Sequence, residues 1–197
     1  MRDHEKLSLD DVQLSQQLGE ALRNRRKKLG KTIVQIAEKT QLSVSFISQI
    51  ERGRSTPSFV SFFKIANALD SSMDELIKIP HQHKTLTRKN ERQKFNLGDP
   101  DRNYENLAPG FTNGTINACI IYGPPGYRSE KFSHEGEEFV YQIKGRVTHI
   151  IEDEEYQIGP GDTLHFDSRR THSSVIGDEE SIELWVGTMP IFENKEE

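Results

Sequence analysis

The sequence has little cysteine and no long hydrophobic run. Cys119 is the only cysteine among 197 residues, so the chain has no internal disulfide and no thiolate cluster for zinc. Its apolar neighbours favour a buried, unreactive thiol. No apolar run approaches the roughly 20 residues of a membrane-spanning helix, and the mixed-charge first residues lack the apolar core of a secretory signal. We therefore expect a cytoplasmic protein with no membrane partner.

The chain also lacks a uniform charge. The formal net charge is −5, but residues 1–95 hold 18 Lys and Arg against 11 Asp and Glu, whereas residues 96–197 hold 8 against 20. The first part is therefore basic and suited to a polyanion, which the acidic second part would repel. A chance distribution of solvated charges is the alternative. Two domains with different partners are the simplest interpretation.

The spacing of apolar residues changes near residue 95. Before this point they recur at helical spacing, which predicts five short helices at about 13–29, 32–40, 43–52, 58–69 and 72–78. A polar, basic segment that begins with proline follows and predicts a linker at 80–94. Beyond it, seven short strand-like runs are separated by Gly, Pro and Asp turns, which is typical of a sandwich or barrel. We expect a multidomain α + β protein with an α-helical domain at 13–79 and an all-β domain at 95–190.

The second and third predicted helices are separated by Gln41 and Leu42 alone, which is typical of a helix-turn-helix. Thr32 and Ser43 stand at the N-cap positions of these helices, and Gln35 completes a capping box with Thr32. The Ile-Ser-Gln-Ile-Glu-Arg-Gly run that ends at Gly53, together with the flanking apolar pattern, resembles the lambda-repressor-like XRE family. This resemblance implies a five-helix DNA-binding domain whose third helix lies in the major groove.

The side chains of the third helix agree with this interpretation. Ile47 and Ile50 point to one side, as core residues would. On the other side, Gln49 can pair with an adenine edge and Val44 can contact a thymine methyl. Phe46 is open between core packing and a groove contact. The predicted DNA-binding residues are Thr32, Ser43, Val44, Ser45, Phe46, Ser48, Gln49, Arg52 and Arg54.

The family resemblance carries two further implications. It implies a structural ion pair between Glu51 and Arg26 of the first helix, which would fix their geometry. It also makes Gln41 a departure, because a turn glycine is common at this position. One such domain covers a single half-site of DNA, so we expect a homodimer in which the second domain joins the two copies.

The second half carries another motif. His134 and Glu138 precede Gly145 with the spacing His-x3-Glu-x6-Gly, and a Gly-Asp turn precedes His172. These features resemble the two motifs of the cupin superfamily, which implies a double-stranded β-helix barrel. Phe132 stands where the family has a further histidine. We read Phe132, His134 and Glu138 as residues of one strand with a common direction.

Two histidines and one carboxylate also form the facial triad of non-haem iron sites. His134, Glu138 and His172 are therefore candidate ligands of a divalent metal such as iron, nickel or zinc, and a metal-free pocket is the alternative. His149 and His165 are expected to be ordinary strand residues, and the alternative is that either lines the barrel. The predicted effector pocket consists of Phe132, His134, Glu138, Tyr141, His172 and Trp185.

The combination of the two domains resembles a family of bacterial one-component regulators. It implies a sequence-specific transcriptional regulator, more often a repressor than an activator, whose cupin domain binds a small-molecule effector or a metal and alters operator binding. We expect no enzymatic activity. The alternative is a mononuclear non-haem iron enzyme of the hydroxypropylphosphonate epoxidase type, which shares this domain order.

Overall fold

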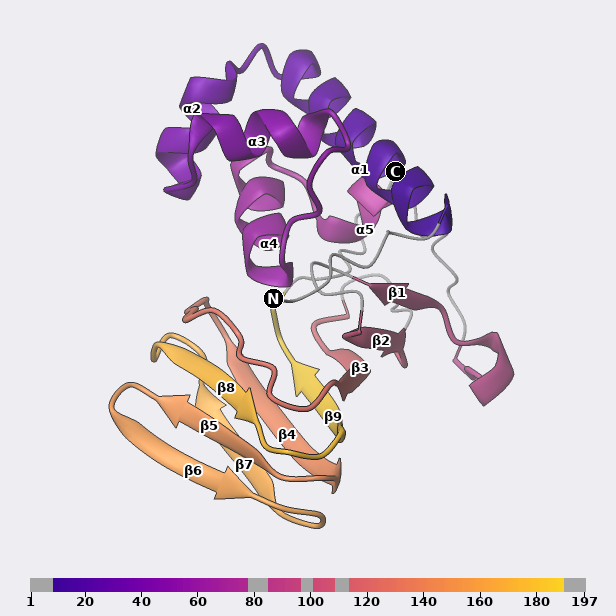
Figure 1. Ribbon diagram of the computed structural model, residues 1–197, viewed down its shortest axis with the longest axis vertical. Coiled ribbons are helices and arrows are strands. Elements are labelled where there is room, and N and C mark those ends of the chain that lie inside the picture. Colours follow the sequence, from indigo (N-terminus) through magenta and orange to yellow (C-terminus); the bar gives the residue numbers. More distant parts are fainter. Residues whose placement is uncertain (1–8, 78–84, 97–100, 109–113, 190–197) are drawn as a thin grey trace. The chain divides into compact units, whose positions relative to one another are not determined.

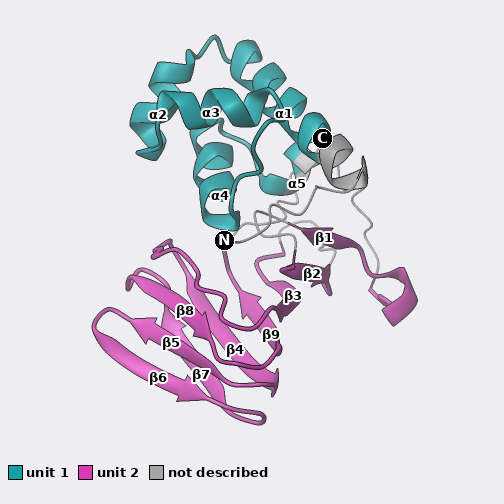
Figure 2. Cartoon of the chain, in the orientation of Figure 1, with its two compact units in different colours: residues 1–79 teal, residues 80–197 magenta. Residues whose placement is uncertain are grey.

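The computed structural model describes residues 9–77, 85–96, 101–108 and 114–189. The chain divides into two compact units, residues 1–79 (the helical unit) and residues 80–197 (the β unit), which Figure 2 shows in two colours. Within the described ranges, no helix is both long enough and apolar enough to cross a membrane.

The helical unit contains four helices of eight residues or more and one short helix (Figure 1). They are α1 (Leu9–Lys28), α2 (Ile33–Thr40), α3 (Val44–Glu51), α4 (Phe59–Ala68) and the five-residue α5 (Met73–Ile77). The core between them consists of fully buried apolar side chains, among them Leu22, Ile36, Ile47, Ile50, Phe62 and Leu69. Burial of this apolar stripe is the main favourable term for helices this short.

The predicted helix starts of this unit are confirmed where local capping defines them. Thr32 accepts a hydrogen bond from the Gln35 amide, and the Gln35 side chain returns one to the Thr32 amide. Ser43 and Ser58 cap α3 and α4 by accepting from the amides of Phe46 and Ser61, without a returning side-chain hydrogen bond. Each cap satisfies an amide that a helix start leaves without a partner. The first helix begins at Leu9, before the start predicted at residue 13.

The β unit consists of two antiparallel sheets (Figure 1). The larger sheet has the order β1-β2-β3-β9-β4-β7 and the smaller one β6-β5-β8. The strands are β1 (Lys94–Asn96), β2 (Asn103–Asn106), β3 (Asn117–Gly123), β4 (Glu137–Lys144), β5 (Val147–Ile151), β6 (Glu154–Ile158), β7 (Thr163–Asp167), β8 (His172–Ile176) and β9 (Ser181–Gly187). Seven of these, β3 to β9, correspond to the strand-like runs read from the sequence.

The strands β1 and β2 pair with each other and pack against the rest of the β unit. The polar sequence of β2 gives no strand pattern, and β2 forms because it pairs with both β1 and β3. Phe95 of β1 stacks on Tyr104 of β2 at 5.0 Å between ring centroids. Arg92 forms an ion pair with the buried Glu105 at 3.2 Å. The last residues of the segment read as a linker therefore pack within the β unit.

The two faces of β4 differ sharply. Glu138, Val140 and Gln142 are buried, whereas Phe139 and Tyr141 are each 38% exposed. This alternation follows from the two-residue period of a strand. Residues directly opposite each other on paired strands share a face, so the register extends the buried face into β9 through Trp185 and Glu183. The buried face forms the interior of the barrel and carries its polar sites.

Candidate functional site

The third helix presents the surface that the sequence assigns to DNA. On its inner side Ile47 and Ile50 are 2% and 1% exposed. Val44 is 45% exposed, and Ser45 and Gln49 are exposed on the opposite side. The helix therefore has one apolar side held by the core and one open side that offers a methyl-bearing residue, a hydroxyl and an amide.

The turn between α2 and α3 sets the direction of α3 and therefore of its open side. Gln41 ends α2 in the left-handed conformation, with φ 59° and ψ 28°. This is the conformation for which glycine is common, and the Gln41 side chain offsets part of its cost by donating a hydrogen bond to the Glu38 carbonyl at 2.8 Å. Ser43 then caps α3 by accepting from the Phe46 amide. The chain thus reverses within three residues, as in a helix-turn-helix.

A buried ion pair fixes α3 against α1. The Arg26 guanidinium donates to both oxygens of Glu51, at 2.6 and 2.7 Å, and the pair predicted from the family resemblance is confirmed. A third Arg26 nitrogen donates to the Lys31 carbonyl. Glu51 raises the pKa of Arg26 by this hydrogen bonding. Bidentate geometry of this kind sets both distance and orientation, so α3 is held as a rigid element.

The predicted DNA-binding residues lie on or beside α3. Thr32 and Ser43 are exposed, and their oxygens accept the cap hydrogen bonds. The Ser43 hydroxyl also forms a hydrogen bond with the Ser45 hydroxyl at 3.1 Å. Phe46 and Ser48 are half-buried. Arg52 and Arg54 are exposed beyond the end of the helix, and Arg52 donates back to the Ser48 carbonyl at 3.0 Å. Their contacts with DNA remain predictions.

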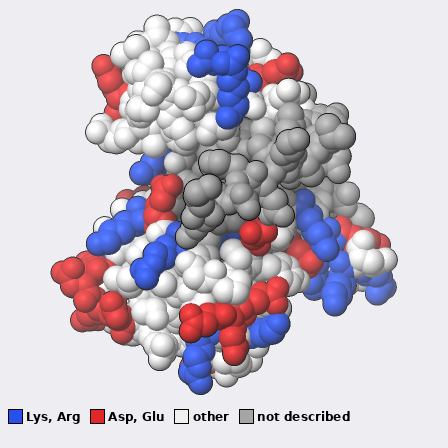
Figure 3. Space-filling view, viewed as in Figure 1, with Lys and Arg blue, Asp and Glu red and all other residues white. Residues whose placement is uncertain are grey.

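The charges of the two units differ on the surface as well as in the sequence. On the face that Figure 3 shows, a column of Lys and Arg side chains crosses the helical unit. The β unit carries several groups of Asp and Glu side chains with Lys and Arg between them. A polyanion would therefore be attracted to the helical unit.

In the β unit, the structure brings His134, Glu138 and His172 together; these three residues are called the triad below. Glu138 comes from β4, and His172 is the first residue of β8. One ligand atom of each residue lies within 4.8 Å of the others. The His134 Nε2 atom is 2.8 Å from Glu138 Oε1, and the His172 Nε2 atom is 3.5 Å from the same oxygen. All three side chains are largely buried.

Backbone carbonyls orient both imidazoles. His134 Nδ1 lies 2.9 Å from the Glu135 carbonyl oxygen, and His172 Nδ1 lies 2.9 Å from the Arg170 carbonyl oxygen. A carbonyl only accepts, so each Nδ1 carries a hydrogen and each Nε2 faces the carboxylate. This is the outer hydrogen bonding that typically aligns histidines for a metal. Two imidazole nitrogens and a carboxylate oxygen that converge in this way form a donor set that fits a divalent cation.

The electrostatics of the triad also favour a positive charge at its centre. Burial raises the pKa of Glu138, but hydrogen bonds and charges from His134 and His172 outweigh it and lower the pKa to about 2. Burial lowers the pKa of His172, but Glu138 raises it above its ordinary value. The carboxylate is therefore ionised, and it favours a positive charge beside it, either on His172 or on a metal ion.

Sequence reasoning was wrong about the local structure of His134. It placed Phe132, His134 and Glu138 on one strand, but β4 begins only at Glu137. Gly136 bends the preceding segment with φ 106°, a conformation that other residues rarely adopt. His134 thus reaches the triad from a loop, and Phe132 reaches it through an isolated bridge to His172.

The structure places three of the six residues predicted to line the effector pocket as follows. Tyr141 is a correction, because it is 38% exposed on the outer face of β4, with the opposite alternation to Glu138. Trp185 is 8% exposed on the interior side of β9, and its ring lies against Gly187, the register partner of Glu138. Phe132 packs beside both histidines, at 5.1 and 6.1 Å between ring centroids.

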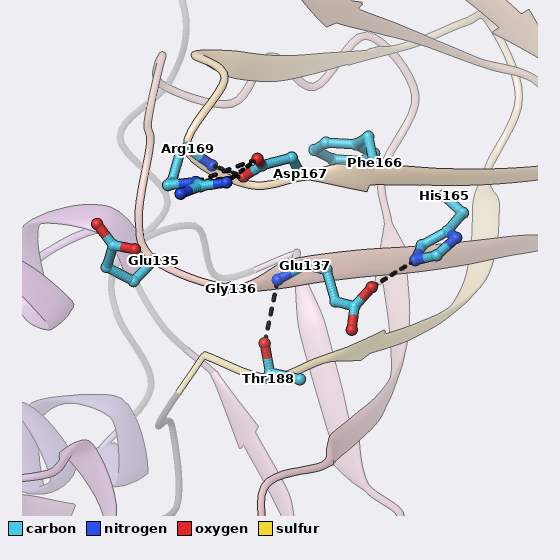
Figure 4. A pocket seen from close by; sticks show the side chains of 8 residues that line it. All are labelled: Glu135, Gly136, Glu137, His165, Phe166, Asp167, Arg169 and Thr188. Carbon is cyan, nitrogen blue, oxygen red and sulfur yellow. Dashed lines mark hydrogen bonds and ion pairs between the residues drawn. The ribbon is translucent and has the colours of Figure 1, made fainter.

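A separate hollow lies on the outside of the β unit (Figure 4). It has a volume of about 570 Å³, and its lining residues are Glu135, Gly136, Glu137, His165, Phe166, Asp167, Arg169 and Thr188. Arg169 is held by Asp167, and Glu137 accepts from His165 at 2.7 Å. None of the six predicted pocket residues lines this hollow. Its lining holds three carboxylates against one arginine, which Asp167 already engages.

Sequence reasoning missed a second polar cluster in the barrel. His149, expected to be an ordinary strand residue, is 9% exposed and its Nε2 is 3.0 Å from the buried Glu183. Arg102 and Gln142 are also buried in this part of the interior. The sequence signal that could have revealed Glu183 is the two-residue period of a strand, because Glu183 lies on the same face of its strand as Trp185. Arg102 precedes a strand that the sequence pattern did not reveal.

Comparison with known families agrees with this architecture. The helix-turn-helix family matches residues 22–76 and the cupin domain family matches residues 120–187. The chain therefore carries a helix-turn-helix domain of the XRE type followed by a cupin domain.

Individual relatives cover different parts of the chain. The cryptic phage CTXphi transcriptional repressor RstR of Vibrio cholerae is 39% identical over 57 residues, which are 29% of this chain. The chain spans about half (51%) of the length of this relative. A crystal structure of an HTH_3 family transcriptional regulator from Vibrio cholerae covers 91% of this chain and 99% of its own, with a TM-score of 0.72 at 20% identity, and shows the same fold.

An enzyme structure is also similar at a lower level. Hydroxypropylphosphonic acid epoxidase from S. wedmorenis covers 87% of this chain and 97% of its own, at 16% identity and a TM-score of 0.44. Such a low TM-score supports no inference about the chemistry of this chain.

Proposed function

We propose that the protein is a sequence-specific DNA-binding transcriptional regulator, acting as a repressor, whose cupin domain binds a metal or a small-molecule effector and thereby modulates operator binding. The observation that carries the proposal is the rigid, outward-facing α3, which Arg26 and Glu51 lock to α1 at 2.6 and 2.7 Å. The match to a relative named as a repressor supports the sign of regulation.

In this proposal the residues on and beside α3 have two kinds of role: some contact bases and others contact phosphates. Gln49 reads a base edge, and Val44 and Ser45 contact bases near the start of the helix. Thr32, Ser43, Arg52 and Arg54 hold the phosphate backbone and set the position of the helix without reading sequence. Phe46 and Ser48, both half-buried, lie at the edge of the contact.

The triad is the proposed switch. His134, Glu138 and His172 would hold a divalent cation, which when bound would act as a Lewis acid or as an anchor for an effector oxygen. Phe132 and Trp185 form apolar walls of this region. A ligand that prefers one arrangement of two β units shifts DNA affinity by its difference in binding free energy between the arrangements.

The outer face of β4 supports a homodimer. Phe139, Tyr141 and Ile143 are 38%, 38% and 43% exposed on adjoining positions of one face. Their register partners Val186 and Leu184 continue this apolar face onto β9. Contiguous apolar patches on a soluble domain mark interaction sites. Because two half-sites need two helical units, we propose that a second copy of this chain covers the patch.

The variant Tyr141→Lys tests this surface. It should be monomeric in analytical ultracentrifugation, and a variant that remains dimeric would refute the surface.

The triad itself favours a second candidate, a mononuclear non-haem iron enzyme of the hydroxypropylphosphonate epoxidase type. Two histidines and one glutamate are the ligand set of such sites. Anaerobic loading with iron followed by a search for substrate-dependent oxygen consumption tests it. Turnover without specific DNA binding would replace the regulator proposal.

The regulator proposal is tested by selection from a library of randomised duplex DNA with the full chain. We expect enrichment of a palindromic sequence with half-sites about one helical turn apart. Affinity for the selected sequence should fall steeply with salt, since bound Lys and Arg release counterions. Failure to enrich any sequence, with the protein folded, would overturn the proposal.

A further inference from the structure

The barrel interior contains a second polar cluster at a distance from the triad, formed by Arg102, Gln142, His149 and Glu183. Gln142 lies four residues beyond Glu138 on β4, which is about 13 Å along a strand. It is the register partner of Glu183 on β9. Both side chains belong to the buried face, so this cluster occupies a different level of the barrel from the triad.

Arg102 contributes a buried cation. It is 7% exposed, and its guanidinium carbon lies 4.3 Å from the ring centroid of Tyr127. Its Nε donates to the Tyr104 hydroxyl at 2.9 Å, but its Nη1 is buried with no hydrogen-bond partner. Among the described residues no carboxylate forms an ion pair with it. A buried guanidinium without an ion pair is unusual, because charged groups are rarely buried unless they are paired.

Gln142 contributes a buried acceptor. It is fully buried, and its Nε2 donates to the Lys144 carbonyl and to Ser181 Oγ at 3.0 Å. A carbonyl only accepts, so this contact fixes which end of the amide is nitrogen. The Oε1 atom is left buried without a partner. The cluster therefore holds one donor and one acceptor that both lack partners.

Glu183 connects these two residues. It lies opposite Gln142 in the register, and its negative charge acts on Arg102. His149 Nε2 is 3.0 Å from Glu183 Oε1, so one carboxylate oxygen of Glu183 is engaged. Arg102 Nη1 lies 3.7 Å from the position that a Cβ atom would take on Gly123, the register partner of Ser181, and Ser181 accepts from Gln142. One positive charge, one negative charge, a donor and an acceptor without partners thus lie in the same part of the barrel. Buried polar atoms of native proteins rarely lack partners unless water, an ion or a ligand fills the site.

We propose that this cluster is a binding site for a small zwitterion of the α-amino acid class. The carboxylate of the ligand would accept from Arg102 Nη1, and its ammonium would donate to Gln142 Oε1 beside Glu183. A simple anion would leave Glu183 unbalanced, and a simple cation would leave Arg102 unbalanced, whereas a zwitterion neutralises both. This inference deepens the proposed sensing function by naming the class of effector, and rests on it only for the effect on DNA.

The test is thermal unfolding and calorimetric titration of the full chain with each proteinogenic amino acid. Acetate and methylammonium, at matched ionic strength, each supply only one end of the zwitterion. We expect at least one amino acid to raise the melting temperature, because a ligand that binds only the folded state stabilises it. Neither acetate nor methylammonium should reproduce the shift. No shift with any amino acid, or an equal shift with acetate, would overturn the proposal.

Variants locate the site. Arg102→Gln and Gln142→Met each remove one contact, and each should weaken the tightest amino acid about tenfold or more. Arg128→Gln, a charge loss on the exposed surface, is the matched control and should bind like the wild type. Because Arg102 is buried, its replacement can disturb folding, so the fluorescence of Trp185 is used to check that each variant is folded. If Arg102→Gln misfolds, Gln142→Met still tests the site. Wild-type affinity in both folded variants would refute the site.

DNA binding is measured separately on the same samples. Amino acid binding without any specific DNA binding would overturn the regulator proposal and leave the zwitterion site standing. Specific DNA binding without amino acid binding would overturn the zwitterion site and leave the regulator proposal standing.

Discussion

The two candidate sites of this chain differ in exposure and in how the chain builds them. The side of α3 that we propose to read DNA is open, and apart from Thr32 the residues of the proposed DNA site come from one short stretch that ends at Arg54. The triad is buried and joins a loop, β4 and β8 across 38 positions of the sequence. A large rigid polyanion is read by a protruding helix, whereas a small ligand or metal needs enclosure to replace its water.

The difference extends to the role of buried charge. In the helical unit the buried pair of Arg26 and Glu51 is complete, with each guanidinium contact satisfied by a carboxylate or a carbonyl. In the β unit, Arg102 and Gln142 each keep a buried atom without a partner. A complete pair fixes geometry, whereas we propose that the two atoms without partners receive a ligand.

The largest expected effect concerns the triad. Glu138→Gln removes the only carboxylate of the donor set, so we expect stoichiometric divalent metal in the wild type and almost none in the variant, measured by elemental mass spectrometry after purification. Glu137→Gln is the matched control, because this neighbour is exposed on the outer surface beside His165. Equal metal content in wild type and Glu138→Gln would show that the triad is not a metal site.

The next largest effect concerns the helical unit. Arg26→Ala leaves Glu51 buried without its partner and should destabilise this unit by about 3 kcal/mol. The single tryptophan, Trp185, lies in the β unit, so urea unfolding followed by fluorescence reports that unit alone, while circular dichroism at the helical band reports the other. We expect only the helical transition to shift. A double change, Arg26→Met with Glu51→Leu, should recover much of the loss.

Gln49 tests whether α3 reads bases. Gln49→Ala should weaken binding to the selected operator by about 1–3 kcal/mol and relax the base preference at one position. Fluorescence anisotropy against operators substituted one base at a time measures both quantities. A loss that is equal on every operator would show that Gln49 does not read sequence.

The smallest effect concerns Arg54. Arg54→Ala removes one expected phosphate contact, so it should weaken all DNA sequences alike and lower the slope of log affinity against log salt by about 1. Titrations at several salt concentrations on operator and on unrelated DNA provide the measurement. A sequence-selective loss would instead assign Arg54 to base reading.

The sequence predicted the local features best. The caps at Thr32 and Ser43 and the inward direction of Ile47 and Ile50 depend only on neighbouring residues, and all are confirmed. The pair of Arg26 and Glu51 came from a family resemblance rather than from spacing. These features require no knowledge of how distant segments meet.

Features that depend on distant pairing could not be read from the pattern. The strand β2 lacks an alternation of apolar and polar residues. It forms because its backbone pairs with β1 on one side and with β3 on the other. His134 reaches Glu138 through a bend at Gly136 rather than along a strand. Tyr141 was assigned to the pocket although its parity differs from that of Glu138, and β4 turns it outward.

We propose above that occupancy of the barrel changes DNA binding. The most direct measurement is the affinity of the full chain for its selected operator after metal loading and after metal removal, at one salt concentration, for wild type and Glu138→Gln. We predict that loading changes the wild-type affinity by about 5- to 150-fold, the range of typical coupling free energies, and leaves the variant unchanged. Identical operator affinity for loaded and metal-free wild type would contradict the account.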